Sequence, residues 1–346
     1  IYLIQIKTLL IGGSKLSDKK ELKISNKSDK PDNIVLRDHL LIEKAIKYEK
    51  RLPSFMKDYF VYLKGSVAVS TRAAYLEDII FFCDYIVSES GLTDKDDIKD
   101  LTIEDFKNIK SRDINLFLGD FCPRYYKERE DHTFVYENNN RALARKKSSL
   151  STLFKFLYRN EQLPTNITDG FNPIKLPKPQ PDAIKRLDID EVMIMLEAVE
   201  SGEGLTDKEK VYWEKTKLRD KAILALFVTY GLRLNELREL NISSFNFSRG
   251  EFKIYRKRGK EVLMPINKTC ETVVIDYINC ERPKSDDLDE EVKDALFLSL
   301  QKKRLTSRAI RQLVKKYTSI CMNTSRDKGY SPHKLRATAA TSLIQS

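Results

Sequence analysis

The hydrophobic positions between residues 40 and 161 recur at intervals of three and four, which is the spacing of an amphipathic α-helix. The clearest apolar stripe lies within residues 52–63 and consists of Leu52, Phe55, Met56, Tyr59, Phe60 and Leu63. Such a stripe gives a helix one apolar face that has to pack against other helices. We therefore predict that this part of the chain forms a helical domain.

Two capping patterns predict where further helices begin. Ser70 or Thr71 precedes a periodic apolar run that Gly91 ends, and Thr102 with Asp105 has the spacing of a capping box. Hydroxyl side chains at these positions accept hydrogen bonds from the first backbone amides of a helix. We expect a helix to start at each place.

The helix predicted over residues 141–160 carries six basic residues and no acidic one. Its apolar face comprises Leu143, Leu150, Leu153, Phe154 and Leu157. We predict that cations and small hydroxyls lie on the other side, where they can meet the phosphates or base edges of DNA. These residues are Arg141, Arg145, Lys146, Lys147, Ser148, Ser149 and Thr152. The alternative is a solvated cationic face that binds nothing, which is the usual fate of a run of charge.

Prolines interrupt the helical pattern between residues 163 and 185. They are Pro173, Pro177, Pro179 and Pro181. Proline has no amide proton and a fixed φ, so the segment is expected to be an extended linker. We predict four parts: a mobile extension over residues 1–39, a helical DNA-binding domain over residues 40–170, a linker over residues 171–186 and a second domain over residues 187–346.

The second domain begins with a capping box formed by Asp188 and Glu191. An apolar helix over residues 218–230 is expected to end at Gly231. Two strands that form a basic hairpin follow, over residues 252–256 and 261–266. Three further helices are expected over residues 269–279, 306–322 and from 333 onward. The predicted fold class is mainly α with a small β-hairpin or sheet, in two domains.

The charge balance favours a polyanionic partner. Lysine and arginine exceed aspartate and glutamate by 62 − 51 = 11, and the isoelectric point is near 9.2. Residues 301–316 hold seven cations and no acid, and the hairpin is also basic. We predict further DNA contacts at Arg256, Arg258, Arg308 and Arg311.

The cysteines and the first residues exclude several classes of protein. The five cysteines are odd in number and scattered, without the spacing of a zinc site, so neither a disulfide framework nor structural zinc is expected. A reducing cytosol fits this usage. The apolar stretch at residues 1–13 is too short to span a bilayer, so we expect neither a membrane segment nor a targeting signal.

Three separated basic motifs indicate a site that handles a phosphodiester. They are residues 230–237 (YGLRLNEL), the hairpin, and residues 331–336 (SPHKLR). The candidate catalytic residues are Arg233, Lys257, His333 and Arg336. Two guanidiniums, an ammonium and an imidazole can neutralise a phosphate in its transition state without a metal, since arginine forks match phosphate oxygens.

Two further residues are candidates for supporting roles. Glu236 lies one helical step from Arg233, where a buried carboxylate can orient the guanidinium; an ordinary surface pair is the alternative. Lys260 lies in the same short hairpin as Lys257 and is the alternative to it, since the turn is short and either ammonium could reach inward.

The three motifs together resemble the active-site boxes of tyrosine recombinases, the phage integrase family. The nearest likeness is to the Xer group, in particular to its single-protein Firmicute form. It extends from residue 40 to the end of the chain and includes Ser70 with Thr71, the basic helix near Ser148, and Asn172 with Pro173.

The resemblance implies site-specific recombination by a C-shaped clamp around double-stranded DNA, made of a helical core-binding (SAM-like) domain and a catalytic domain. It implies that Arg233 and Arg336 hold the non-bridging oxygens of the scissile phosphate. Lys257 would act as general acid, and His333 would hydrogen-bond the phosphate or assist proton transfer. The family keeps the bond energy in a 3′-phosphotyrosyl link and needs no cofactor or metal. Its members usually act as tetramers, so a homo-oligomer on DNA is expected.

The sequence departs from the family at two places. Ala337 stands where a histidine is usual, and no tyrosine follows Arg336. Tyr317 and Tyr330 precede His333, so neither is a candidate nucleophile. The chain as written is therefore expected to be a carboxy-terminally incomplete copy that binds DNA without cutting it. A non-catalytic DNA-binding accessory protein and a type IB topoisomerase are the alternatives.

Overall fold

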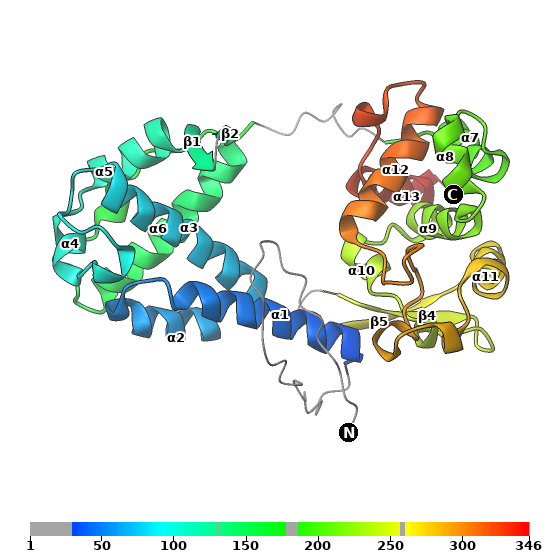
Figure 1. Cartoon of the computed structure of the whole chain (residues 1–346), viewed down its shortest axis with the longest axis horizontal. Helices are drawn as coiled ribbons and strands as arrows, with labels where there is room; N and C mark the ends of the chain where they lie inside the picture. The colour runs from blue at the N-terminus through cyan, green and yellow to red at the C-terminus, as the bar shows by residue number, and fades with distance from the viewer. Residues whose placement is uncertain (1–29, 130–131, 178–185, 257–259, 346) are drawn as a thin grey trace. The chain divides into compact units, whose positions relative to one another are not determined.

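The computed structural model describes residues 30–129, 132–177, 186–256 and 260–345 (Figure 1). The chain divides into two compact units, which we call the N-terminal unit (Ile34–Lys178) and the C-terminal unit (Pro179–Ser346 together with Ile1–Asn33). Residues 1–29 of the predicted extension lie outside the described part of the chain. The first helix, α1 (Asp32–Glu49), begins earlier than the predicted start at residue 40.

The N-terminal unit is mostly helical. After α1 come α2 (Lys57–Ser66), α3 (Val69–Ser88), α4 (Ile103–Asn108), α5 (Ser111–Leu116) and α6 (Asn140–Arg159). Short turns lie between them: η1 (Ser54–Met56), η2 (Ile98–Asp100), the π-helical η3 (Phe117–Phe121) and η4 (Ile167–Gly170). An antiparallel hairpin, β1 (Arg124–Arg129) with β2 (His132–Glu137), precedes α6.

Aromatic side chains fill the core of this unit. The rings of Phe82 and Phe117 meet edge to face with their centroids 5.0 Å apart, and Phe106 stacks on Phe154 at 5.8 Å. Such pairs add to the stabilisation that burial of the rings provides. The apolar stripe predicted for residues 52–63 is confirmed, since five of its six members are buried and Phe55 is partly buried: Leu52, Met56, Tyr59, Phe60 and Leu63.

Both predicted helices are present, and one of the two predicted caps is right. Thr102 and Asp105 form a reciprocal capping box at the beginning of α4, as predicted. Helix α3 begins at Val69, so the prediction of a cap at Ser70 or Thr71 is wrong. Its N-cap residue makes no side-chain hydrogen bond, and buried side chains that pack into the core hold the first turn instead.

The hairpin of β1 and β2 was not predicted, because only helices were expected between residues 40 and 161. Tyr125 and Tyr136 are cross-strand partners, and their rings stack with centroids 5.2 Å apart. Tyr125 also packs against Phe81 of α3 at 4.7 Å. Aromatic and β-branched residues favour strands, so residues 124–137 carried this signal.

The C-terminal unit consists of helices and one small sheet. Its helices are α7 (Ile189–Ser201), α8 (Asp207–Trp213), α9 (Lys217–Tyr230), α10 (Leu234–Arg238), α11 (Lys268–Asp276), α12 (Ser307–Cys321) and α13 (Pro332–Gln345). The strands β3 (Phe245–Asn246), β4 (Glu251–Tyr255) and β5 (Glu261–Pro265) form an antiparallel sheet in the order β3-β4-β5. Shorter turns are η6 (Ile242–Ser244), the π-helical η8 (Tyr277–Glu281), η9 (Ser285–Asp287), η10 (Glu290–Val292) and η11 (Arg326–Lys328).

Helix α9 is the centre of this unit and packs against α7, α11 and α13 (Figure 1). All its residues from Ala222 to Phe227 are buried, so it is apolar on every side. It ends as predicted: Gly231 adopts φ +55°, and its amide donates to the carbonyl of Phe227. The capping box predicted for Asp188 and Glu191 begins α7.

The predicted strands and later helices are confirmed with shifts of a few residues. Strands β4 and β5 pair from Glu251 with Pro265 to Tyr255 with Glu261. The helices predicted over residues 269–279, 306–322 and from 333 onward correspond to α11, α12 and α13. The fold is thus mainly α with small antiparallel sheets, as predicted.

All five cysteines are free thiols. Burial raises the pKa of Cys83, and it raises the pKa of Cys122 to about 12. Both thiols therefore stay protonated near neutral pH and act as small apolar side chains. Among the described residues, no helix is both long and apolar enough to cross a membrane.

A close backbone approach fixes the segment that leads into α13. A Cβ placed on Gly329 would lie 2.1 Å from the carbonyl oxygen of Lys315 in α12. The amide of the next residue, Tyr330, donates to the hydroxyl of Thr318, also in α12. Only glycine allows this contact, which sets the position of the motif at residues 331–336.

We predict that Gly329→Ala lowers the free energy of unfolding by about 2–4 kcal/mol, because α12 and the loop must move apart. Gly250→Ala is the matched control in the same unit. Gly250 has φ +63° but no atom within 4 Å of its added Cβ, so only the strain of a left-handed residue, about 1–2 kcal/mol, is expected. Denaturant unfolding measures both, and equal losses would contradict the close approach.

Candidate functional site

The buried carboxylate of Glu236 holds Arg233. Arg233 is the N-cap residue of α10, and its amide donates to Oε2 of Glu236 at 2.8 Å. Its guanidinium Nη1 donates to Oε1 of the same carboxylate at 2.7 Å. Glu236 is 5% exposed, whereas the side chain of Arg233 is 46% exposed. One edge of the guanidinium is therefore fixed, and the rest remains accessible.

The same carboxylate also attracts a cation from the hairpin. Nε of Arg256 lies 3.9 Å from Oε1 of Glu236, and the Arg256 side chain is 41% exposed. The amide of Arg256 donates to the carbonyl of Lys260 at 2.8 Å, which closes the base of the hairpin. Because Glu236 is buried and has two arginine partners, Arg233 and Glu236 do not form an ordinary surface pair.

Helix α13 brings Arg336 to the same end of α9. A Cβ placed on Gly231 would lie 3.5 Å from Cγ of Arg336 and 3.3 Å from Cβ of Ala339. Leu335 and Ala339 are buried and anchor this face of α13. Gly231 therefore permits α13 to pack against the turn that carries Arg233.

The structure thus joins parts of the three basic motifs. Arg233 and Arg256 share Glu236, and Arg336 lies beside the turn before Arg233. His333 is exposed and lies one helical turn before Arg336, so both are on the same side of α13. Within the described ranges, neither His333 nor Arg336 has a hydrogen-bond or ion-pair partner.

Two predicted residues of the hairpin cannot be placed. Lys257 and Arg258 lie outside the described residues. Lys260, the alternative acid, is described and exposed.

The tyrosine of α12 is unsuited to nucleophilic attack. The hydroxyl of Tyr317 is buried and donates to Asp220 at 3.3 Å. Burial, together with the Asp220 carboxylate, raises the pKa of Tyr317. This agrees with leaving Tyr317 out of the candidate nucleophiles.

The prediction that all the polar residues of α6 face outward is wrong for Lys146 and Ser149. Lys146 is 8% exposed, Ser149 is fully buried, and both contact Asp78 of α3. Lys146 lies four residues before Leu150, and Ser149 lies four residues before Leu153. Helical periodicity therefore places both beside the apolar stripe.

The other predicted residues of α6 differ in what they contact. Lys147 donates to the carbonyl of Asn172 at 2.8 Å, and Ser148 and Thr152 donate to backbone carbonyls one turn earlier in the helix. Arg141 and Arg145 are exposed cations. At the start of α12, Arg308 and Arg311 are exposed as well.

Asp78 is the residue that the sequence pattern did not single out. It lies in an apolar helix and is 2% exposed. A charged residue inside such a run was the available signal, because a buried carboxylate needs cationic or hydrogen-bonding partners.

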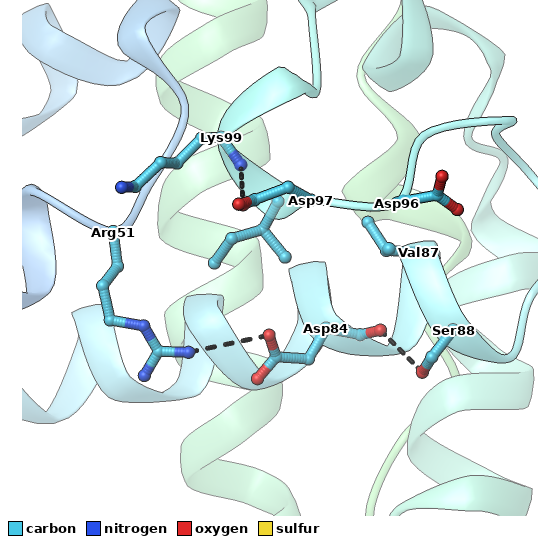
Figure 2. A pocket seen from close by; sticks show the side chains of 8 residues that line it. Arg51, Asp84, Val87, Ser88, Asp96, Asp97 and Lys99 are labelled. Atoms are coloured by element: carbon cyan, nitrogen blue, oxygen red, sulfur yellow. Dashed lines mark hydrogen bonds and ion pairs between the residues drawn. The ribbon is translucent and has the colours of Figure 1, made fainter.

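A surface hollow elsewhere in the N-terminal unit has the wrong chemistry for a phosphate. Figure 2 shows Arg51 directed at Asp84, with Asp96, Asp97 and Lys99 around the same hollow. Three carboxylates against two cations repel an anion. In the described residues, no group of three or more His, Cys, Asp or Glu side chains is arranged to hold a metal ion.

Comparison with known proteins finds relatives that are integrases or tyrosine recombinases. A family model described as the phage integrase family matches residues 185–346. The tyrosine recombinase XerC of Syntrophus aciditrophicus (strain SB) is 27% identical over 292 residues, 84% of this chain and 83% of the relative. The tyrosine recombinase XerS of Streptococcus thermophilus (strain CNRZ 1066) is 26% identical over 334 residues, 90% of each chain. The crystal structure of XerH site-specific recombinase bound to difH substrate has a TM-score of 0.56, covers 93% of this chain and 81% of that one, and at 17% identity shows a shared fold.

We predict that Glu236→Ala lowers the free energy of unfolding by about 1–3 kcal/mol, because the N-cap hydrogen bond is lost and two guanidiniums lose their anion. Glu236→Gln should lose less, since an amide oxygen can still accept from the Arg233 amide. Glu197→Ala removes an exposed acid of α7 and should change stability by less than about 0.5 kcal/mol. Denaturant unfolding measures all three variants. If Glu236→Ala and Glu197→Ala change the free energy of unfolding equally, the buried carboxylate does not hold the site together.

Proposed function

This chain belongs to the phage integrase family as an Xer-like tyrosine recombinase, and we propose that its clustered arginines bind the phosphate at which a DNA strand is cut and rejoined. The proposed reaction is site-specific recombination on double-stranded DNA. The observation that carries it is the meeting of three separated segments around Gly231 and the Glu236 carboxylate.

The proposed roles follow from the charge that develops at phosphorus. Arg233 and Arg336 would stabilise the non-bridging oxygens as negative charge grows on them. Arg233 is suited to this role because Glu236 fixes one edge of its guanidinium before substrate arrives. His333, one helical turn from Arg336, would hydrogen-bond the same group.

A cation on the hairpin would protonate the departing 5′ oxygen. We assign this general-acid role to Lys257, with Lys260 as the second candidate. Tyrosine attack would keep the bond energy in a 3′-phosphotyrosyl link, so rejoining needs no nucleotide cofactor.

DNA binding would spread beyond this phosphate. The exposed cations Arg141 and Arg145 of α6, and Arg308 and Arg311 of α12, are proposed contacts with the phosphate backbone. Their number predicts an affinity that falls steeply with salt, with a log–log slope of about 0.9 per phosphate neutralised. Assembly as a homo-oligomer, a tetramer on two duplexes, is the proposed active form.

Two other functions remain to be separated from this one. A DNA-binding accessory protein would occupy the site and never transfer a strand. A type IB topoisomerase would relax any supercoiled plasmid without needing paired sites. Both would use the same cationic surface, so binding alone does not distinguish the three.

The test begins with selection of bound duplexes from a random library, which supplies the target site. A plasmid with two copies of that site then reports recombination by the product of the native gene. We predict that Arg233→Ala and Arg336→Ala each lower recombination by about 10²–10³-fold, while DNA affinity changes little. Arg249→Ala, which removes an exposed arginine of the turn between β3 and β4, is the matched control and should retain activity.

The outcomes separate the three functions. Full recombination by Arg233→Ala would contradict the proposed phosphate site. Relaxation of a plasmid without the site would favour a topoisomerase. Site binding without recombination or relaxation by the gene product would favour an accessory protein.

A further inference from the structure

Asp78 lies in the middle of α3 and receives three donors from a single helix. It is 2% exposed, and its carboxylate accepts from Lys146 Nζ at 3.1 Å and from Ser149 Oγ at 2.8 Å. Nη1 of Arg145 donates to its second oxygen, Oδ2. All three donors are on α6, the helix with the basic surface.

The charges in this cluster do not cancel. Lys146 alone would neutralise Asp78, and it is buried with its ammonium 4.4 Å from the centroid of the Phe81 ring. Arg145 adds a second cation, and its side chain is 45% exposed. The cluster therefore has one surplus positive charge, and the Arg145 side chain is partly exposed to solvent.

The guanidinium of Arg145 is held at one corner only. Nη1 contacts Asp78 and also donates to the carbonyl of Ala74 at 3.3 Å. In the part of the chain that the structure describes, Nε and Nη2 of Arg145 make no hydrogen bond to protein. The remaining donors are thus oriented on a side chain that is 45% exposed, and such donors suit a phosphate oxygen.

We propose that Asp78 is a positioning residue for DNA binding, which holds the Arg145 guanidinium in place for a backbone phosphate. The inference rests on the proposed role of α6 in DNA binding. A side chain that is fixed before binding loses less conformational freedom when the complex forms, so affinity gains from the anchor. Asp78 itself does not touch the DNA.

The direction of the effect distinguishes positioning from simple electrostatics. A carboxylate near DNA repels the phosphates, so its removal by Asp78→Asn should strengthen binding if only net charge matters. If Asp78 positions Arg145, the same substitution weakens binding. A general effect on the fold would instead weaken binding whether or not Arg145 is present.

The experiment measures the affinity for a mixed-sequence duplex of roughly 30 base pairs across a salt series, with fluorescence anisotropy. We expect Arg145→Gln to weaken binding roughly 3- to 10-fold and to lower the salt slope by about 0.9. Asp78→Asn should weaken binding in the same direction. The double variant should bind no worse than Arg145→Gln alone, because Asp78 acts through Arg145.

Asp84→Asn is the charge-matched control. Asp84 is on the same helix, but it pairs with Arg51 at 3.8 Å and not with α6 (Figure 2). Its removal should leave affinity unchanged or slightly increased. Denaturant unfolding checks that each variant is folded.

Two results would overturn the proposal: Asp78→Asn binding as tightly as the unaltered chain, or more tightly, while Arg145→Gln binds more weakly, or additive losses in the double variant. No loss for Arg145→Gln would instead contradict the proposed role of α6. If Asp78→Asn does not fold, Ser149→Ala takes its place, since it removes one donor and leaves both cations. Ser149→Ala should weaken binding about 2-fold when Arg145 is present and should not weaken it in the Arg145→Gln background. Equal losses in the two backgrounds would overturn the proposal.

Discussion

Repulsion between like charges is the constraint that this part of the chain has to overcome, because Arg233 and Arg256 lie close to the same point. Glu236 relieves it by placing a buried anion under two arginines. The carboxylate is almost out of contact with water, so its attraction for Arg233 and Arg256 is stronger than at the surface. It fixes the cations and leaves about half of each side chain accessible. Arg336 has no such partner among the described residues, so its charge is available to an anion.

The backbone supplies the second part of the arrangement. Gly231 ends a helix that is buried on every side, and its left-handed turn sends the chain straight into Arg233. The same glycine lets α13 approach, and Gly329 lets the preceding loop lie against α12. The core therefore determines where Arg233 and Arg336 lie, although they are 103 positions apart in the sequence (336 − 233).

Local signals in the sequence were sufficient for most elements. Capping boxes at Thr102 and Asp188 marked where helices begin, and Gly231 marked where one stops. Each of these signals depends on residues only a few positions apart. The hairpin of β1 and β2 was missed although its aromatic and β-branched residues carried a local strand signal. The packing of Tyr125 against Phe81, a partner distant in the sequence, could not be read from that signal.

The candidate site was predictable by residue type and only in part by position. The motif spacing identified Arg233, Glu236 and Arg336, but the contact of Arg256 with Glu236 depends on how the hairpin folds back. Lys146 was placed on the wrong face because its charge suggested solvent, whereas its spacing from Leu150 indicated the core. A buried acid on another helix decided between the two, and no local pattern reveals such a partner.

The most direct measurement is a crystal structure of this chain bound to a duplex that contains its selected site. The account predicts that the guanidiniums of Arg233 and Arg336 both lie about 3 Å from non-bridging oxygens of one phosphate, with Glu236 still beneath Arg233. Arginines that contact different phosphates, or an Arg336 turned into the protein, would contradict it.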